Sequence, residues 1–217
     1  EWSIWSDTPT LGRRATASLF AAPATCSFRR RTWFAASRLS RSPRCRITAR
    51  SCWRCPNVNV DIRPSPPHDP DAVQLVHKYM TEVASRWYGR PAEDHEVARA
   101  LSEEPATDLE DPTGCFAVAY VRGTPVGVGG VRFVDEHIAE LTKVFTVPSV
   151  RGLGIGTAML NHLERVAVAK GRRTIRLDTR SDLSEACQLS ERRGYERVAP
   201  FNDAQYSDRW YLRRYGE

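Results

Sequence analysis

The stretch Val147-Pro-Ser-Val-Arg-Gly-Leu-Gly-Ile-Gly-Thr157 places three alternate glycines between a predicted strand and a predicted helix. Residues 138–147 are apolar enough for a central β-strand, and residues 155–169 carry apolar side chains at the spacing of an amphipathic helix. The first amides of such a helix have no internal hydrogen-bond partner, and the helix dipole adds positive potential there. This junction therefore predicts an anion site suited to a phosphate or a pyrophosphate.

Known phosphate-binding patterns narrow the interpretation of this loop. The dinucleotide fingerprint G-x-G-x-x-G requires Gly or Ala at position 157, where this chain has Thr157. The nucleotide-triphosphate motif G-K-[ST] does not occur in the chain. The pattern that remains is R-x-x-G-x-G, which runs from Arg151 to Gly156. A plain glycine turn without a ligand is the alternative.

The segments on either side of the loop predict a mixed fold. Strands are expected at 58–62, 116–121, 126–133, 138–147, 174–177, 195–198 and 210–214, and helices at 70–88, about 94–103, 155–169 and 183–193. An antiparallel meander followed by a βαβ unit favours one mixed central sheet of about six to seven strands with helices on both faces. The expected fold class is therefore α/β, of the α+β type.

The positive charge of the chain is concentrated in its first quarter. Within 217 residues of net charge +6, residues 1–58 hold eleven arginines, no lysine and two acidic residues, a net of +9. Residues 59–217 hold 21 basic and 24 acidic residues, a net of −3, which argues against a nucleic-acid-binding face there. Residues 1–57 show no regular periodicity, and we expect a disordered or non-native basic extension. A targeting segment and a binding arm are the alternatives, and residues 58–217 form the expected domain.

The cysteines and the apolar runs limit the remaining classes. Cys52 and Cys55 form one C-x-x-C pair, but Cys26 and Cys45 are 19 residues apart, whereas structural zinc needs four tetrahedral ligands. We therefore expect no metal site. No apolar run approaches the roughly 20 residues that cross a bilayer, so no membrane partner is expected. Nothing in the pattern demands disulfides, and the expected location is cytoplasmic.

The glycine loop and its surroundings together resemble the GNAT superfamily of acyl-CoA-dependent N-acetyltransferases. The resemblance includes R-x-x-G-x-G at 151–156, A-E-L-T-K-V-F-T-V-P at 139–148 and E-A-x-x-L-x-x-x-x-G-Y at 185–195. W-Y-G at 87–89, P-V-G-V-G-G at 125–130 and F-N-D-A-Q-Y-S-D-R-W at 201–210 resemble small bacterial single-domain members. The resemblance covers about residues 58–215 and implies a GNAT fold, whose central sheet is splayed in the middle.

The resemblance implies that acetyl-CoA is the co-substrate and that it binds in the cleft between the splayed strands. The pantetheine would follow the strand before the loop, and the pyrophosphate would bind to the loop amides. The implied cofactor-binding residues are Phe145, Thr146, Val147, Arg151, Gly152, Leu153, Gly154, Ile155, Gly156 and Thr157. An amine would then attack the thioester directly, in a ternary complex, without a covalent enzyme intermediate.

Three side chains are candidates for proton transfer in this reaction. The resemblance implies that Glu140, on the strand before the loop, is the base; the alternative is an ion pair with Lys143 or a neighbouring Arg. The family carries an acidic Tyr where this chain has Ser190, and a serine hydroxyl is too weak an acid to replace it unaided. Ser190 acting through water, Tyr206 as a substitute, and loss of transfer are the three open outcomes.

The acceptor site is the least determined part of the sequence. Tyr88, Phe201 and Trp210 are candidates for lining it, together with Tyr206, and packing at the core or rim is their alternative role. The expected function is transfer of an acetyl group to a primary amine of a small acceptor, by a monomer or a homodimer. A catalytically weak module that binds or senses acyl-CoA is the alternative function.

Overall fold

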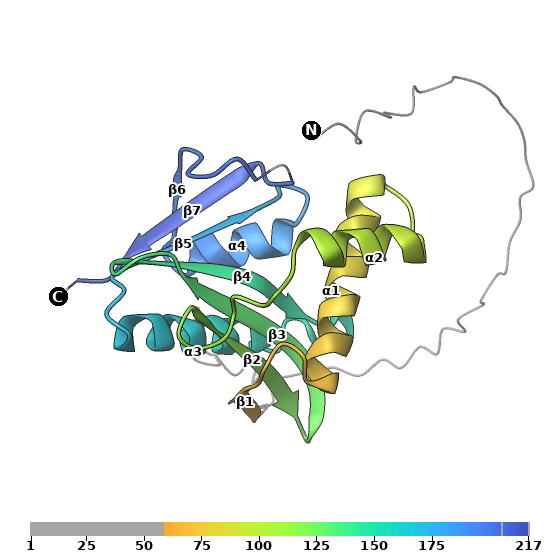
Figure 1. The fold of residues 1–217 in the computed structure, drawn as a ribbon, viewed down its shortest axis with the longest axis horizontal. Helices are drawn as coiled ribbons and strands as arrows, with labels where there is room; N and C mark the ends of the chain where they lie inside the picture. The colour runs from red at the N-terminus through yellow and green to blue at the C-terminus, as the bar shows by residue number, and fades with distance from the viewer. Residues whose placement is uncertain (1–58, 205, 217) are drawn as a thin grey trace, which may run out of the picture. The chain divides into compact units, whose positions relative to one another are not determined.

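The computed structural model describes residues 59–204 and 206–216, which form seven strands and four α-helices (Figure 1). The strands are β1 (Val60–Pro64), β2 (Gly114–Val121), β3 (Thr124–Phe133), β4 (Ile138–Thr146), β5 (Thr174–Thr179), β6 (Glu196–Val198) and β7 (Arg209–Arg214). The helices are α1 (Pro70–Tyr88), α2 (Asp94–Glu103), α3 (Ile155–Ala169) and α4 (Ser184–Arg192). Element order and fold class agree with the sequence-based expectation, which is confirmed. The basic extension and the C-x-x-C pair lie outside the described residues and stay predictions.

The strands form one mixed sheet in the order β1-β2-β3-β4-β5-β7-β6. Strands β1 to β4 pair as an antiparallel meander, β4 and β5 are parallel, and β7 runs antiparallel to both β5 and β6. The parallel step requires a crossover, which α3 supplies between β4 and β5. The apolar strand β4 is therefore central, as its composition predicts.

Strands β4 and β5 stay paired over a short distance only. Their ladder joins Ile138–Glu140 to Thr174–Arg176, although β4 continues to Thr146 and β5 to Thr179. Beyond this ladder the two strands diverge, and the sheet is splayed in its middle as the resemblance implied. The splay opens toward the end of β4 from which the glycine loop starts.

Apolar side chains on both faces of the sheet hold the helices against it. On one face, Met159 and Leu163 of α3 are buried against Val131 and Leu141 of the sheet. On the other face, Leu75 and Val76 of α1 are buried with Val128 and other apolar residues. Burial of each aliphatic side chain contributes about 1.5–3 kcal/mol, so these two clusters fix the helices that border the splay. None of the described helices is long and apolar enough to cross a membrane.

Gly129 of β3 sets how closely α3 approaches the sheet. A Cβ atom built at this position would lie 2.9 Å from both Leu163 Cδ1 and Met159 Cγ. Real Cβ atoms essentially never make contacts this short, so a larger residue would push α3 away. The close approach in turn fixes the first turn of α3, where the glycine loop ends.

A β-bulge interrupts the pairing of β4 with β3. Val128 pairs with Phe145 and Gly130 pairs with Thr142, so that Lys143 and Val144 together lie opposite Gly129. Lys143 adopts a φ of 53°, in the left-handed region that disfavours residues with a side chain. Such strain costs on the order of 1–3 kcal/mol and persists where surrounding structure enforces it, often beside functional sites.

Candidate active site

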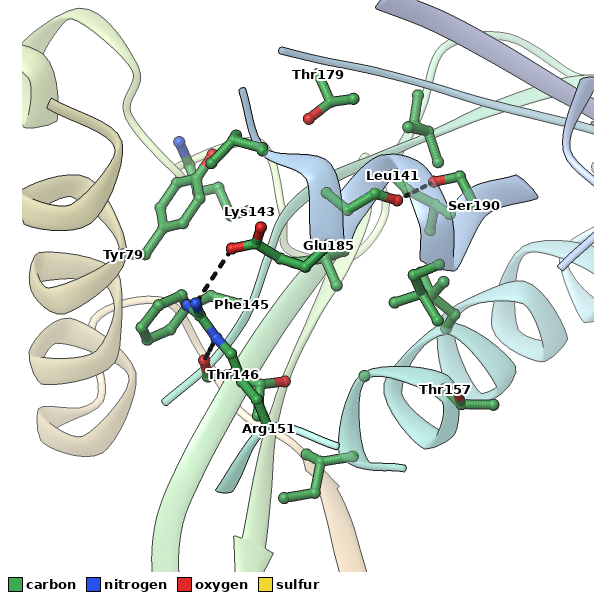
Figure 2. Close-up of a pocket in the computed structure, with 18 of the residues that line it drawn as sticks. Tyr79, Leu141, Lys143, Phe145, Thr146, Arg151, Thr157, Thr179, Glu185 and Ser190 are labelled. Carbon is green, nitrogen blue, oxygen red and sulfur yellow. Dashed lines mark hydrogen bonds and ion pairs between the residues drawn. The ribbon is translucent and has the colours of Figure 1, made fainter. Parts of the chain in front are cut away.

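A cavity of about 560 Å³ lies where β4 and β5 diverge. Its walls come from both strands, from the glycine loop with the first turn of α3, and from α1 and α4 (Figure 2). Of the residues expected to bind acyl-CoA, Phe145, Thr146, Arg151, Gly152, Gly154, Ile155, Gly156 and Thr157 line this cavity, whereas Val147 and Leu153 do not. The fold thus brings the loop and the preceding strand together around one cavity.

The glycine loop presents free backbone amides at this cavity. Gly154 is the N-cap of α3 with a φ of 83°, and Gly152 has a φ of 80°, both in the region that glycine tolerates best. No side chain caps the helix, and within the described residues no group accepts a hydrogen bond from the N–H groups of residues 152–157. A row of unsatisfied donors at a helix N-terminus fits the pyrophosphate of a coenzyme.

Arg151, the first residue of the motif, contacts protein groups on three elements. Its Nε donates to the carbonyl of Thr146 at 3.0 Å, its Nη1 lies 3.1 Å from Glu185 Oε1, and its Nη2 lies 2.6 Å from Glu82 Oε2. Figure 2 shows the first two of these contacts, with the guanidinium between β4 and α4. The guanidinium therefore ties the loop to α1 and α4.

Arg86 completes an ion-pair network with the same two carboxylates. Its Nη2 contacts Glu82 at 2.8 Å and also contacts Glu185, so that two guanidinium groups alternate with two carboxylates. Hydrogen bonding to Glu185 raises the pKa of Arg86. Partial burial opposes ionisation of Glu185, but its hydrogen bond from Arg86 outweighs this and lowers the pKa of that carboxyl. Arg86 and Glu185 are consequently charged at neutral pH.

Ser190 lines the cavity from α4, but its hydroxyl is already bonded. It is 4% exposed, and its Oγ donates to the backbone carbonyl of Ala186 at 2.9 Å (Figure 2). This is the common bond of a helical serine to the carbonyl four residues earlier. A proton used in this way is not offered to a ligand, which adds to the intrinsic weakness of an alcohol as an acid.

Glu140 lies between two arginines of the neighbouring strands. Its Oε1 accepts from Arg132 Nη1 at 3.0 Å, and its Oε2 accepts from Arg176 Nε at 2.9 Å. The sheet register explains both contacts, because Arg132 on β3 and Arg176 on β5 are the direct cross-strand neighbours of Glu140. Glu140 is 7% exposed and is not part of the cavity wall. These are the ion pairs that were the alternative to a role as base, and the partners are neighbouring arginines rather than Lys143.

Tyr206 also lies outside the cavity wall. Its hydroxyl donates to Glu103 Oε2 at 3.3 Å, and its ring packs edge-on against Trp87 with centroids 5.0 Å apart. Burial and the nearby Glu103 carboxylate raise the pKa of Tyr206 to about 12. The phenol is therefore held between Glu103 of α2 and Trp87 of α1.

The three aromatic residues expected at the acceptor site do not line the cavity either. The Arg90 guanidinium lies 5.0 Å from the ring centre of Tyr88, and the Arg176 guanidinium lies 4.2 Å from that of Phe201. Trp210 Nε1 donates to Asn202 Oδ1 at 2.7 Å, which orders the segment before β7. Tyr88, Phe201 and Trp210 thus make packing contacts at the rim, which was the alternative to lining the acceptor site.

Several polar side chains of the cavity wall were not predicted from the sequence, among them Tyr79 on α1, Lys143 on β4 and Asp178 on β5. Lys143 Nζ is turned to the end of α2, donating to the Glu104 carbonyl at 2.9 Å, and burial lowers its pKa. Asp178 accepts from Asn202 Nδ2 at 3.2 Å and from the Ser207 hydroxyl. Tyr79 could have been predicted from helical spacing, because it lies three residues after Val76 and four before Val83, on the apolar face of α1.

Comparison with known proteins defines the class to which this fold and site belong. Residues 77–195 match the Acetyltransferase (GNAT) family, and the chain belongs to that family, a class of acyltransferases. It is also 32% identical over 87 residues to an N-acetyltransferase of Methanocaldococcus jannaschii, a match that covers 37% of this chain. The chain spans only 38% of the length of that relative. The GNAT assignment made from the motifs is thereby confirmed.

Solved structures of the family share the fold at low sequence identity. A GNAT-family acetyltransferase from Staphylococcus aureus has a TM-score of 0.58 and 16% identity, over 72% of this chain and 99% of that one. PaiA N-acetyltransferase from Thermoplasma acidophilum, in complex with coenzyme A, has a TM-score of 0.59 and 17% identity, over 72% of this chain and 99% of that one. The protein yncA from Salmonella typhimurium, solved with acetyl-CoA, has a TM-score of 0.52 and 19% identity, over 73% and 95%.

Proposed function

We propose that this protein transfers the acetyl group of acetyl-CoA to a primary amine of a small acceptor, by direct attack in a ternary complex. The observation that carries the proposal is the row of free amides at residues 152–157, which opens into the cavity between β4 and β5. Membership of the acetyltransferase family and the relatives solved with coenzyme A or acetyl-CoA support the same co-substrate.

The shape of the cavity supports one direction for the bound coenzyme. A diphosphate on the loop amides leaves the pantetheine arm to follow β4 back from Thr146 toward the point where β4 and β5 meet. That path runs past Phe145 and ends at the bulge formed by Lys143 and Val144. The thioester then lies at the bulge, between the α1 wall and the α4 wall of the cavity.

The chemistry requires two proton movements and one charge stabilisation at that point. The acceptor must lose a proton before its nitrogen attacks, and the departing thiolate must gain one. The oxygen of the tetrahedral intermediate needs a hydrogen-bond donor, because charge develops on it in the transition state. The bulge supports this role, since a bulged segment frees backbone groups from the sheet ladder.

The acceptor side of the cavity is acidic, which supports a cationic amine. Asp178 lines the cavity, Glu104 lies beside Lys143 with its carboxylate 3.5 Å from Nζ, and Glu103 follows on α2. Negative charge at the mouth of a cleft raises the local concentration of an ammonium substrate. A cytoplasmic location and a monomeric or homodimeric state stay predictions from the sequence.

The proposed function is tested by thiol release from acetyl-CoA in the presence of a panel of primary amines. Gly154→Val introduces a branched side chain at a position that lines the cavity and whose Cβ would meet no protein atom within 4 Å, so the added side chain obstructs a ligand and not the protein. Gly171→Val is the matched control, because Gly171 has a similar φ of 89° and equally open space but lies after α3, away from the cavity.

We expect Gly154→Val to abolish acetyl-CoA binding, measured by calorimetry, and Gly171→Val to preserve it. Both variants place a branched residue in the left-handed region, so the strain, on the order of 1–3 kcal/mol, is shared by the pair. Equal affinity of the two variants for acetyl-CoA would contradict the proposed site.

A catalytically weak acyl-CoA-binding module is the second candidate function. The observation in its favour is Ser190, whose hydroxyl is bonded to Ala186 at the place where the family carries an acidic tyrosine. Tight binding of acetyl-CoA without thiol release for any amine of the panel would support this module over the enzyme.

A further inference from the structure

Resting on the proposed function, we propose that Tyr79 is the catalytic acid of this transferase and donates its phenolic proton to the leaving thiolate of coenzyme A. Tyr79 projects from α1 into the cavity, on the side opposite Ser190 (Figure 2). The assignment depends on three features: the kind of hydroxyl group that the cavity offers, the position of Tyr79 beside the bulge, and the charges around it.

The hydroxyl groups of the cavity wall differ in acidity. The described residues of the wall carry six of them, on Tyr79, Thr142, Thr146, Thr157, Thr179 and Ser190. Tyr79 is the one phenol of this set, and a phenol has an ordinary pKa of about 10, close to that of a thiol. Alcohols are far weaker acids, so the set contains a single hydroxyl suited to protonating a thiolate.

The other candidate proton donors are directed to protein groups or lie outside the cavity wall. The Ser190 hydroxyl donates to Ala186, and the Lys143 ammonium is turned away to the Glu104 carbonyl, at 2.9 Å. Tyr206 is absent from the cavity wall and donates to Glu103. The Tyr79 hydroxyl, in contrast, makes no hydrogen bond to any residue within 59–204 or 206–216, which leaves its proton for a ligand.

Tyr79 lies next to the part of β4 where the thioester is expected. Its ring packs on Phe145, with centroids 6.0 Å apart and planes inclined by 59°. Phe145 is two residues beyond Lys143, so Tyr79 packs on the strand next to the bulged segment. The pantetheine arm that follows β4 therefore brings its sulfur to the side of the cleft on which Tyr79 stands.

Carboxylates on both sides of the cleft act on the Tyr79 phenol. Burial raises its pKa, and Glu104 after α2 and Asp178 on β5 raise it further, so the phenol keeps its proton at neutral pH. The other charged groups facing it are Lys143 on β4 and Glu82, one turn further along α1. The acceptor nitrogen is positively charged again once it has attacked the thioester, and between Glu104 and Asp178 this charge would offset theirs and bring the pKa of Tyr79 back toward that of the thiol.

The step balances without an additional reagent. The bound ammonium first gives one proton to solvent water. The lone pair of the resulting neutral amine forms the C–N bond to the thioester carbonyl carbon, and the C–S bond then breaks with its electron pair leaving on sulfur. The proton on Tyr79 Oη moves to the sulfur and completes the thiol. The proton released by the acceptor nitrogen passes to water and from water to the phenolate, which restores Tyr79.

The test compares Tyr79→Phe with Tyr120→Phe in the full chain. Tyr120 is a control phenol on β2 that donates to Asp71 at 2.9 Å and does not line the cavity. We expect Tyr79→Phe to lower kcat by about 10²-fold or more, with the Kd for acetyl-CoA within about twofold of wild type. Tyr120→Phe should keep both values.

A fluorinated tyrosine incorporated at position 79 separates proton donation from packing. Its phenol is more acidic at nearly unchanged shape, so the alkaline limb of the kcat profile should move to lower pH. An unmoved limb overturns the proposal, even if Tyr79→Phe fails to fold. Wild-type turnover with full kcat in Tyr79→Phe overturns the Tyr79 assignment alone, whereas a wild-type protein that acetylates no amine overturns the proposed function as well.

Discussion

Arg151 Nη2 lies 2.6 Å from Glu82 Oε2, across 69 residues of sequence, and this contact joins the glycine loop to helix α1. The same guanidinium bonds the Thr146 carbonyl at the end of β4, so one side chain links strand, loop and helix at the cavity. The loop whose amides we propose to bind the pyrophosphate is thereby held from the side. The guanidinium of Arg151 orders this loop through its contacts with protein groups.

The first prediction concerns this contact. Arg151→Gln and Glu82→Gln should each raise the Kd for acetyl-CoA about fivefold, because each loosens the loop by about 1 kcal/mol. The double variant should be little worse than either single variant, with a coupling energy of about 0.5–1 kcal/mol, since the side chains are 32% and 21% exposed. Calorimetric titration of the three variants and the wild type with acetyl-CoA gives the coupling energy of this double-mutant cycle.

The pair of Arg63 with Asp61 provides a control for these variants. Its side chains are 60% and 52% exposed, and it lies on the edge strand β1, three strands away from β4. Arg63→Gln should leave acetyl-CoA affinity unchanged. If Arg151 instead bound the pyrophosphate directly, Arg151→Gln alone would weaken binding and Glu82→Gln would not.

The second prediction concerns Glu140 and its two arginines. Glu140→Gln leaves Arg132 and Arg176 with an uncharged partner in a mostly buried position, so the free energy of unfolding should fall by about 2–4 kcal/mol. The pH profile of kcat/KM should stay as in wild type, because the carboxylate is not part of the cavity wall. Urea unfolding and a pH–rate series test the two statements.

Arg132→Gln is the matched variant for Glu140, since it removes one of the same ion pairs from β3 and should also destabilise the fold. A Glu140→Gln protein of unchanged stability whose kcat/KM falls by about a hundredfold or more would instead identify Glu140 as the base.

The third prediction concerns Ser190. Ser190→Ala removes only the bond to the Ala186 carbonyl, so kcat should stay within about twofold of wild type and unfolding free energy should fall by less than about 1 kcal/mol. Steady-state thiol release with a reactive amine measures the effect. Abolished turnover in Ser190→Ala would show that the serine acts on the substrate in spite of its internal bond.

The fourth prediction uses the pH dependence of stability. Burial lowers the pKa of Lys143 from its ordinary 10.5, so between the folded pKa and 10.5 the unfolded chain binds more protons than the folded one. Stability rises with pH wherever the unfolded state binds more protons. The unfolding free energy of wild type should therefore increase relative to Lys143→Met as pH approaches 10.5.

Lys78→Met is the control for this series, because Lys78 is an exposed lysine on α1. The pH dependence of the difference for Lys143→Met is compared with that for Lys78→Met. If the two pH dependences were the same, a lowered pKa for Lys143 would be contradicted.

Local patterns in the sequence were sufficient to predict the strands, the helices and the glycine loop. The apolar period of residues 155–169, the glycines at 152, 154 and 156, and the apolar run of β4 are each properties of neighbouring residues. Hydrophobic periodicity and helix-start chemistry act over one or two turns, and they therefore predict secondary structure and the free amides of α3 without knowledge of the fold.

Tertiary structure decided which polar groups meet. Glu140 faces Arg132 and Arg176 because of strand register, and Arg151 reaches Glu82 and Glu185, 69 and 34 residues away. The sequence offers many carboxylates and guanidinium groups of equal chemistry, so nothing local selects among them. Partners follow from the order of strands in the sheet and from the direction in which each helix crosses it.

The sequence by itself determined the family, the order of strands and helices, and the glycine loop, because these depend on residues close together along the chain. The tertiary structure alone decided that Tyr79 lines the cavity at the bulge while Tyr206 is held outside the cavity wall by Glu103. Tyr79 lies within a helix and Tyr206 in the segment before the last strand, and neither location by itself says which phenol faces the cavity. The splay of β4 from β5 and the packing of α1 across it place Tyr79, and not Tyr206, in the cavity wall.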